Sequence, residues 1–228
     1  MGVLVAIIAA GIFALWTPAW RWLSSRPWES NQKSAVNFGA FSPKGGYFLL
    51  EEEGKVNGRW YTAVRAISVL DNTTKIPMKL REASNVAAAR SAALAALPQP
   101  ALAALGLSAP APAAFVPAGP AGAHRFKLTV NGLLTELTLV EKVADSSPVC
   151  GGPSKMFELD ARNRYGRRGL QDDDHVPLSR ACATGYAMTG VFVQGDRVAV
   201  IVKVTAKPRL SRGFRFIAVT GKLGATTP

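Results

Sequence analysis

The chain has 228 residues, 48% of them hydrophobic and 18% charged, which suits one globular domain with a short appendage. Two cysteines exclude a disulfide-rich framework and a structural zinc site. The 27 Lys and Arg residues against 15 Asp and Glu residues give a net charge of +12, which favours anionic partners. Neither a recognition helix nor stacking aromatic residues accompany the basic residues, so we expect no nucleic-acid partner.

The N-terminal segment is apolar from Val3 to Leu15 and can be extended to Leu23, where a helix of about 30 Å would cross a bilayer. Aromatic and basic residues of the kind that anchor a helix at the membrane interface gather at its C-terminal edge: Trp16, Trp20, Arg21 and Trp22. No positive region precedes the segment, and its best cleavage site, 17–19, is followed by a tryptophan. We therefore expect a retained transmembrane helix within residues 1–26, with a cleaved signal segment as the alternative.

The sequence contains features that favour each of the two possible topologies of this anchor. Positive charges flank the segment only on its C-terminal side, which by the positive-inside rule favours a cytoplasmic domain. Long domains, however, translocate with little regard for their own charge. The cysteine pair, together with the resemblance described below, favours export. We expect a single-pass inner-membrane protein with its domain in the periplasm.

After a polar connector at 27–35, β-branched and aromatic runs predict four strands, at 36–41, 47–51, 61–70 and 75–80. Turn-forming residues separate them at Pro43–Gly46 and at Asp71–Thr74. An Ala-rich helix is then expected at 85–97, capped by Ser84, and a short one at 101–105. Residues 108–123, within an insertion at 98–123, are so rich in Ala and Pro that we expect a linker or surface loop.

Further strands are predicted in the second half of the chain, at 125–130, 133–142, 156–161, 186–194, 197–203 and 214–220. Asn131-Gly132 is a strong hairpin signal, whereas 163–180 is expected to be an exposed loop. The strand at 197–203 is apolar on both faces, which predicts a central position. The expected fold is mainly β, an antiparallel sandwich or partial propeller-like sheet over 36–222, with a tail at 223–228.

Both cysteines, Cys150 and Cys182, lie in Gly-, Pro- and Ser-type loop sequence. In an exported domain we expect them to form one disulfide, since oxidising compartments join exposed pairs. The alternative is two unrelated free thiols.

Four arginines, Arg162, Arg164, Arg167 and Arg168, form the clearest basic cluster, and we consider them a candidate anion patch. A second cluster contains Lys203, Lys207, Arg209 and Arg212. The plainer interpretation is that these residues only keep a basic surface soluble.

No motif of a known catalytic or cofactor-binding type occurs in the sequence, so we expect no enzyme activity, cofactor or metal. Asp172, Asp173, Asp174 and His175 have the composition of a cation site, but consecutive residues of an extended chain point in alternate directions and rarely converge. Glu51, Glu52 and Glu53 lack a visible catalytic partner, and a charged strand end explains them better.

Two stretches carry a resemblance to known proteins. The run Phe41-Ser42-Pro43-Lys44-Gly45-Gly46-Tyr47 resembles the opening of bacterial propeller blades, although it occurs once. Together with the runs 185–202 and 211–220, the order of elements over 37–221 resembles a proteobacterial family of predicted secreted proteins of unknown function. The resemblance implies export and a β-rich domain, and it transfers no catalytic residue.

We expect the protein to be a non-catalytic, membrane-anchored accessory or scaffold subunit of an integral membrane protein complex. The alternative is a periplasmic binding module for anionic envelope polymer or for an anionic lipid surface.

Overall fold

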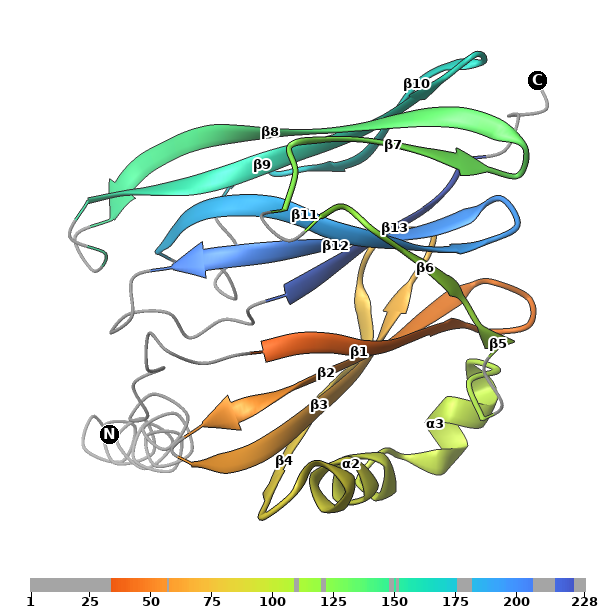
Figure 1. Cartoon of the computed structure of the whole chain (residues 1–228), viewed down its shortest axis with the longest axis vertical. Coiled ribbons are helices and arrows are strands. Elements are labelled where there is room, and N and C mark those ends of the chain that lie inside the picture. The colour runs from red at the N-terminus through yellow and green to blue at the C-terminus, as the bar shows by residue number, and fades with distance from the viewer. Residues whose placement is uncertain are drawn as a thin grey trace, which may run out of the picture.

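The computed structural model describes residues 34–56, 58–108, 111–119, 122–147, 150, 152–175, 182–206 and 216–223. These residues form three antiparallel sheets and two short helices (Figure 1), so the expected mainly β, antiparallel class is confirmed. In the part of the chain that is described, neither helix is long and apolar enough to cross a membrane. The expected N-terminal anchor, with Trp16, Trp20, Arg21 and Trp22, lies outside the described residues.

The three sheets are stacked in layers, one upon another (Figure 1). Sheet A contains, in spatial order, β4 (Thr74–Ala83), β3 (Arg59–Ser68), β2 (Tyr47–Val56), β1 (Ser34–Phe41) and β5 (Ala111–Pro112). Sheet B, the middle layer, contains β13 (Phe216–Lys222), β12 (Arg197–Ala206), β11 (Ala183–Gln194) and β6 (Ala114–Pro117). Sheet C contains β10 (Gly166–Asp172), β9 (Gly152–Asn163), β8 (Leu133–Ser147) and β7 (Arg125–Val130).

Strand β12 is buried on both faces, as its sequence predicts. Val198, Val200 and Val202 pack into the core between sheets B and C, while Ala199 and Ile201 pack into the core between sheets A and B. Because successive side chains point to opposite faces, only a strand that is apolar at every position can fill two cores at once.

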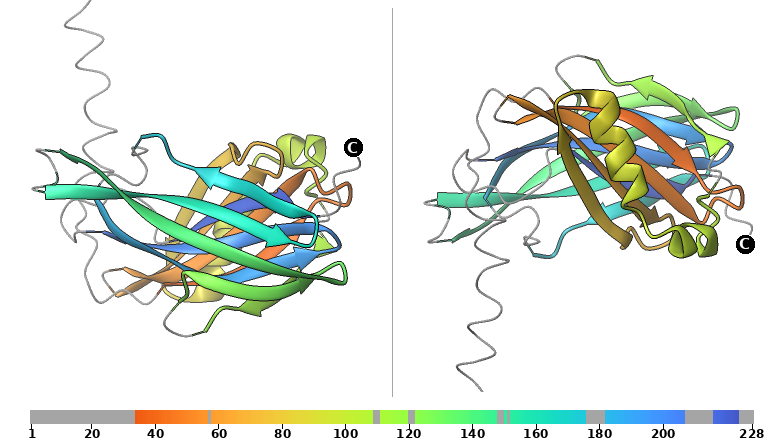
Figure 2. Two further views of the ribbon diagram at one scale, coloured as in Figure 1. Left: turned by 90° about the horizontal axis from the view of Figure 1, so that it is seen from above. Right: turned by 90° about the horizontal axis from the view of Figure 1, so that it is seen from below.

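A third core lies on the outer face of sheet A, where α2 (Val86–Ala95) and α3 (Gln99–Ala104) cover the strands (Figure 2). Ala93 and Leu102 are the buried contacts that the helices share with Val64 and Ile76 of the sheet. The N-cap of α2 is Asn85, whose side chain accepts a hydrogen bond from the Ala88 amide, so the predicted cap at Ser84 is wrong by one residue.

The predicted hairpin turns of the chain are confirmed. Asn131 and Gly132 both have positive φ, 49° and 74°, as a two-residue type I′ turn requires. The 71–74 turn places Asn72 at φ 56°, and the Ser42–Gly46 turn joins β1 to β2.

Two predicted loops are wrong because the structure finds strands in them. The Ala- and Pro-rich stretch contains β5 and β6, which pair with the edges of β1 and β11 and so form a strap across sheets A and B. The expected loop at 163–180 contains β10, which pairs with β9. Proline and glycine are tolerated in both places because β5, β6 and β10 are edge strands.

Candidate anion-binding surface

Three hairpin turns and the end of β13 meet at one end of the molecule, which we call the hairpin end (Figure 1). The Asn163 side-chain amide donates to the Leu223 carbonyl at 3.2 Å, and the Leu223 amide donates to the Asp196 carbonyl at 2.7 Å. Arg197 Nη2 donates to the Lys44 carbonyl at 3.0 Å. These bonds tie together the β9–β10, β11–β12 and β1–β2 turns, which come from all three sheets.

The β9–β10 hairpin brings the four predicted arginines to this end. Arg162 and Arg167 are direct cross-strand partners, and Arg168 follows on β10. At the turn, the Asn163 side-chain oxygen accepts a hydrogen bond from the Tyr165 amide at 2.8 Å, and Gly166 adopts a φ of +124°. Both arginines also have acidic neighbours: Arg162 is the cross-strand partner of Glu136 of β8, and Arg167 lies against Asp160 of β9.

A second pair of like charges lies at the same end, on sheet B. Arg197 of β12 is the cross-strand partner of Lys222 of β13. Lys44 lies in the adjoining β1–β2 turn, against the Arg197 guanidinium. These three residues could not be predicted from the sequence, because long-range contacts rather than sequence spacing bring them beside the arginines.

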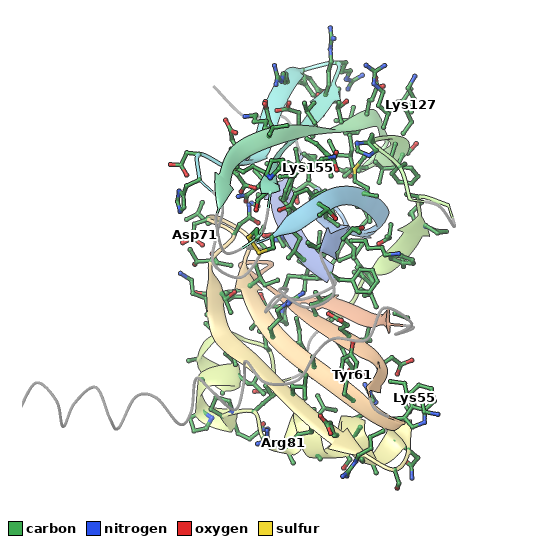
Figure 3. The ribbon with its side chains drawn as sticks, turned by 90° about the vertical axis from the view of Figure 1, so that its left-hand side faces the viewer. Lys55, Tyr61, Asp71, Arg81, Lys127 and Lys155 are labelled. Atoms are coloured by element: carbon green, nitrogen blue, oxygen red, sulfur yellow. A yellow bond between two sulfur atoms is a disulfide. The ribbon has the colours of Figure 1, made fainter. Side chains whose placement is uncertain are left out.

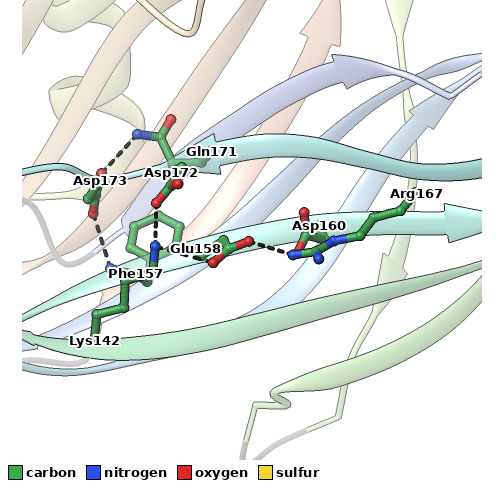
Figure 4. Close-up of polar contacts among 8 residues, drawn as sticks. All are labelled: Lys142, Phe157, Glu158, Asp160, Arg167, Gln171, Asp172 and Asp173. Atoms are coloured by element: carbon green, nitrogen blue, oxygen red, sulfur yellow. Dashed lines mark hydrogen bonds and ion pairs between the residues drawn. The ribbon is translucent and has the colours of Figure 1, made fainter.

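One of the four arginines is already neutralised by carboxylates. Arg167 contacts Asp160 at 2.5 Å and Glu158 at 2.6 Å, and the hydrogen bond that it donates to Asp160 raises the pKa of its guanidinium. Lys142 extends the network to Glu158 at 3.2 Å and Asp172 at 2.5 Å (Figure 4). Within the described residues, Arg162, Arg164 and Arg168 are exposed and have no ion-pair partner, so they carry the positive field of the hairpin.

The Asp172–His175 run does not converge on a common point. Asp172 pairs with Lys142, whereas Asp173 is buried and accepts hydrogen bonds from the Phe157 amide and the Gln171 side chain (Figure 4). Asp174 contacts His175 at the exposed end of the run. Across the described ranges, no group of three or more metal-ligating side chains is placed to hold an ion.

Of the three consecutive glutamates, Glu51 and Glu52 point to opposite faces of sheet A. Glu51 is buried and pairs with Arg90 of α2 at 2.6 Å, and this contact raises the pKa of Arg90. Glu52 accepts a hydrogen bond from Tyr61, which Figure 3 places in sheet A. Both carboxylates therefore have structural partners.

Arg65 is a buried cation between sheets A and B. It donates a hydrogen bond to the Phe216 carbonyl of β13. Burial lowers the pKa of its guanidinium, and the nearby Glu52 carboxylate opposes that shift. Arg65 therefore joins two sheets and is not available to a ligand at the surface.

Cys150 and Cys182 form a disulfide with a Cα–Cα distance of 5.1 Å. Both are buried, and the bond joins the β8–β9 connection of sheet C to the beginning of β11 in sheet B. We call this side of the domain, opposite the hairpin end, the disulfide end (Figure 1). Lys203 lies towards this end of β12, while Lys207, Arg209 and Arg212 of the second basic cluster lie outside the described residues.

A family model described as predicted secreted protein (DUF2259) matches residues 74–222. The matched range begins at β4 and ends at β13, and it includes the arginine hairpin, Arg197, Lys222 and both cysteines. No curated protein and no solved structure is significantly similar to the chain. The chain belongs to the DUF2259 family of predicted secreted proteins.

Proposed function

We propose that this protein is a non-catalytic, extracytoplasmic binding protein whose hairpin end holds an anionic polymer of the envelope or anionic lipid headgroups. The observation that carries the proposal is that bonds between the three sheets hold the arginine hairpin beside Lys44, Arg197 and Lys222, so that exposed cations from all three sheets meet at one end. The family description and the disulfide support an oxidising, extracytoplasmic location.

Lys44 and Arg164 are exposed on turns, and Arg168 and Lys222 are exposed on edge strands, as an extended ligand with repeated charges requires. Arg162 is exposed on the inner strand β9, whereas Arg197 of β12 is half-buried beside Asp196. Guanidinium groups suit such a ligand because their planar donors match carboxylate and phosphate groups. Binding through exposed charges is screened by salt, so affinity is expected to fall steeply as ionic strength rises.

The test is the binding of the full-length chain, in a non-ionic detergent, to inorganic polyphosphate and to phosphatidylglycerol vesicles. Arg162→Ala with Arg168→Ala removes two exposed charges and is expected to weaken binding about tenfold or more, since each such charge contributes about 1 kcal/mol. The matched control is Arg59→Ala with Lys203→Ala, which removes two exposed charges from the disulfide end. Equal losses from the two double variants, or no binding by the natural chain, would contradict the proposal.

The apolar N-terminal segment with its tryptophans favours a second candidate function, that of a membrane-anchored accessory or scaffold subunit. In this proposal residues 1–26 hold the chain in the inner membrane of a proteobacterium, and the periplasmic β domain contacts acidic faces of an integral membrane protein complex. Mild detergent extraction followed by native purification tests it. A stoichiometric membrane protein that remains bound supports this role, whereas recovery of a lone chain argues against it.

A further inference from the structure

We infer that the ligand of the hairpin end is an acidic polysaccharide, recognised by Tyr165 together with the arginines around it. This inference rests on the proposed function and narrows its ligand class. It depends on the one aromatic side chain at the tip of the arginine hairpin.

Tyr165 is held in an exposed position by its neighbours. It lies in the two-residue connection between β9 and β10, and 54% of its surface is accessible. Its amide donates to the Asn163 side chain at 2.8 Å, which fixes the turn. An exposed tyrosine at a turn has no core to fill, so the ring surface that Arg164 leaves uncovered is available for contact with a ligand.

The Arg164 guanidinium is fixed against the same ring. Its central carbon is 4.8 Å from the ring centroid, and Nη2 donates to the Tyr165 hydroxyl at 2.7 Å. A cation over an aromatic face at this distance is attracted by the ring quadrupole. The two side chains therefore form a preorganised unit that combines an apolar ring surface with planar, charged donors.

An acidic sugar matches this unit better than a simple anion does. The C–H face of a pyranose ring is apolar and can lie on an aromatic ring, while its carboxylate can accept paired donors from a guanidinium. Arg162 lies on β9 two residues before the unit, and Arg168 lies on β10, where its pairing with Ala161 turns it to the other face of the hairpin. Acidic groups on neighbouring sugars would therefore meet one further cation along either strand. A sugarless polyanion can use the cations alone and gains nothing from the ring.

The test compares Tyr165→Ala and Tyr165→Phe in the full-length chain, in a non-ionic detergent, against polygalacturonate and inorganic polyphosphate at one ionic strength. Tyr165→Ala is expected to weaken binding to polygalacturonate about five- to tenfold, the range of an aromatic contact. Its affinity for polyphosphate is expected to change less than about twofold, because every charge remains. Tyr165→Phe keeps the ring and is expected to retain most of the affinity for polygalacturonate.

The outcomes separate this inference from the proposed function. An equal loss on both polymers, or no loss on either, overturns the inference and leaves the proposed function standing. Binding to phosphatidylglycerol vesicles without binding to polygalacturonate also overturns the inference, in favour of lipid headgroups. If the natural chain binds none of the three probes, the proposed function itself fails.

Discussion

Asn72 joins the three sheets through a single side chain. In the β3–β4 turn of sheet A, it donates to the Leu170 carbonyl of β10 at 2.8 Å and accepts the Thr220 amide of β13 at 2.6 Å. The Thr220 hydroxyl adds a third bond at 2.8 Å. Its φ of 56° is one that asparagine and glycine tolerate better than other residues.

Replacing Asn72 is expected to destabilise the domain in a graded way. Asn72→Gly keeps the backbone conformation but loses three hydrogen bonds, and should lower the free energy of unfolding by about 2–3 kcal/mol. Asn72→Ala adds backbone strain and should cost about 1 kcal/mol more. Denaturant unfolding measures both, with Asn131→Gly as the control, since Asn131 also has positive φ but lies in an exposed turn. Equal effects at Asn72 and Asn131 would contradict this role.

Glu141 joins sheet C to the edge of β11. Its carboxylate accepts hydrogen bonds from the Lys155 ammonium at 2.5 Å and from the Tyr186 amide at 2.6 Å. Figure 3 shows Lys155 where sheets B and C meet. Burial acts to raise the pKa of this carboxyl, but the hydrogen bonds from Lys155 and Tyr186 outweigh it, so the pKa is lowered. The stabilisation is therefore present above the unfolded pKa of about 4.3 and is lost as pH falls through the lower folded pKa.

Glu141→Gln is expected to lower the free energy of unfolding by about 1–2 kcal/mol at pH 7, because it removes the charge that Lys155 pairs with. The difference between the two proteins should shrink as pH falls below about 4, where the natural carboxyl becomes protonated. Urea unfolding at pH 7 and pH 3 measures it. A difference that stays the same at both pH values would show that the ion pair does not contribute.

Among the elements, the strap formed by β5 and β6 is held against β11 because the Phe115 ring packs directly over Gly190. The Phe115 ring centroid lies 4.7 Å from that of Phe192, and a Cβ on Gly190 would lie 2.3 Å from Phe115 Cζ. The absence of a side chain at Gly190 thus lets the strap approach β11 closely.

A double-mutant cycle tests this contact. Gly190→Ala and Phe115→Ala should each lower the free energy of unfolding, by about 1–3 kcal/mol, through overpacking and lost packing respectively. Gly190→Ala should cost less in the Phe115→Ala background, since the ring that it displaces is gone. The rescue is expected to be partial, because the Val116 carbonyl would still lie 2.9 Å from the new Cβ. Strictly additive effects would contradict the contact.

Elements with a strong local pattern could be predicted from the sequence, and those fixed by their neighbours could not. The valines of β12 and the Asn131-Gly132 turn carry their own periodicity and turn chemistry, and both are confirmed. Strands β5, β6 and β10 are rich in Ala, Pro, Gly or Arg, and only pairing with β1, β11 and β9 makes them strands. Their edge positions tolerate residues that a central strand would exclude.

At the scale of the whole molecule, the disulfide joins sheets B and C across 32 residues of chain. Loop-closure entropy predicts that Cys150→Ala with Cys182→Ala lowers the free energy of unfolding by about 3–4 kcal/mol. Thermal unfolding with and without a reductant checks this. The natural protein should lose stability in reductant, whereas the double variant should not respond. The disulfide assignment would be contradicted if the stability of the natural protein did not change after it was unfolded and refolded in reductant.

The candidate site was only partly predictable for the same physical reason. Arg162, Arg164, Arg167 and Arg168 are close in sequence, so their meeting on one hairpin follows from the chain itself. Lys44, Arg197 and Lys222 are far apart in sequence and join them through contacts such as Arg197 to Lys44 and Asn163 to Leu223. The neutralisation of Arg167 by Asp160 likewise depends on the fold of β9 against β10.

Hydrogen–deuterium exchange of the full-length chain, with and without inorganic polyphosphate, tests the location of the anion-binding surface most directly. We expect slower exchange in the turns of the hairpin end, at 42–46, 163–166 and 195–196, and unchanged exchange between β2 and β3 at the other end of sheet A. Slower exchange between β2 and β3 and around Cys182, with none at the hairpin end, would contradict this location.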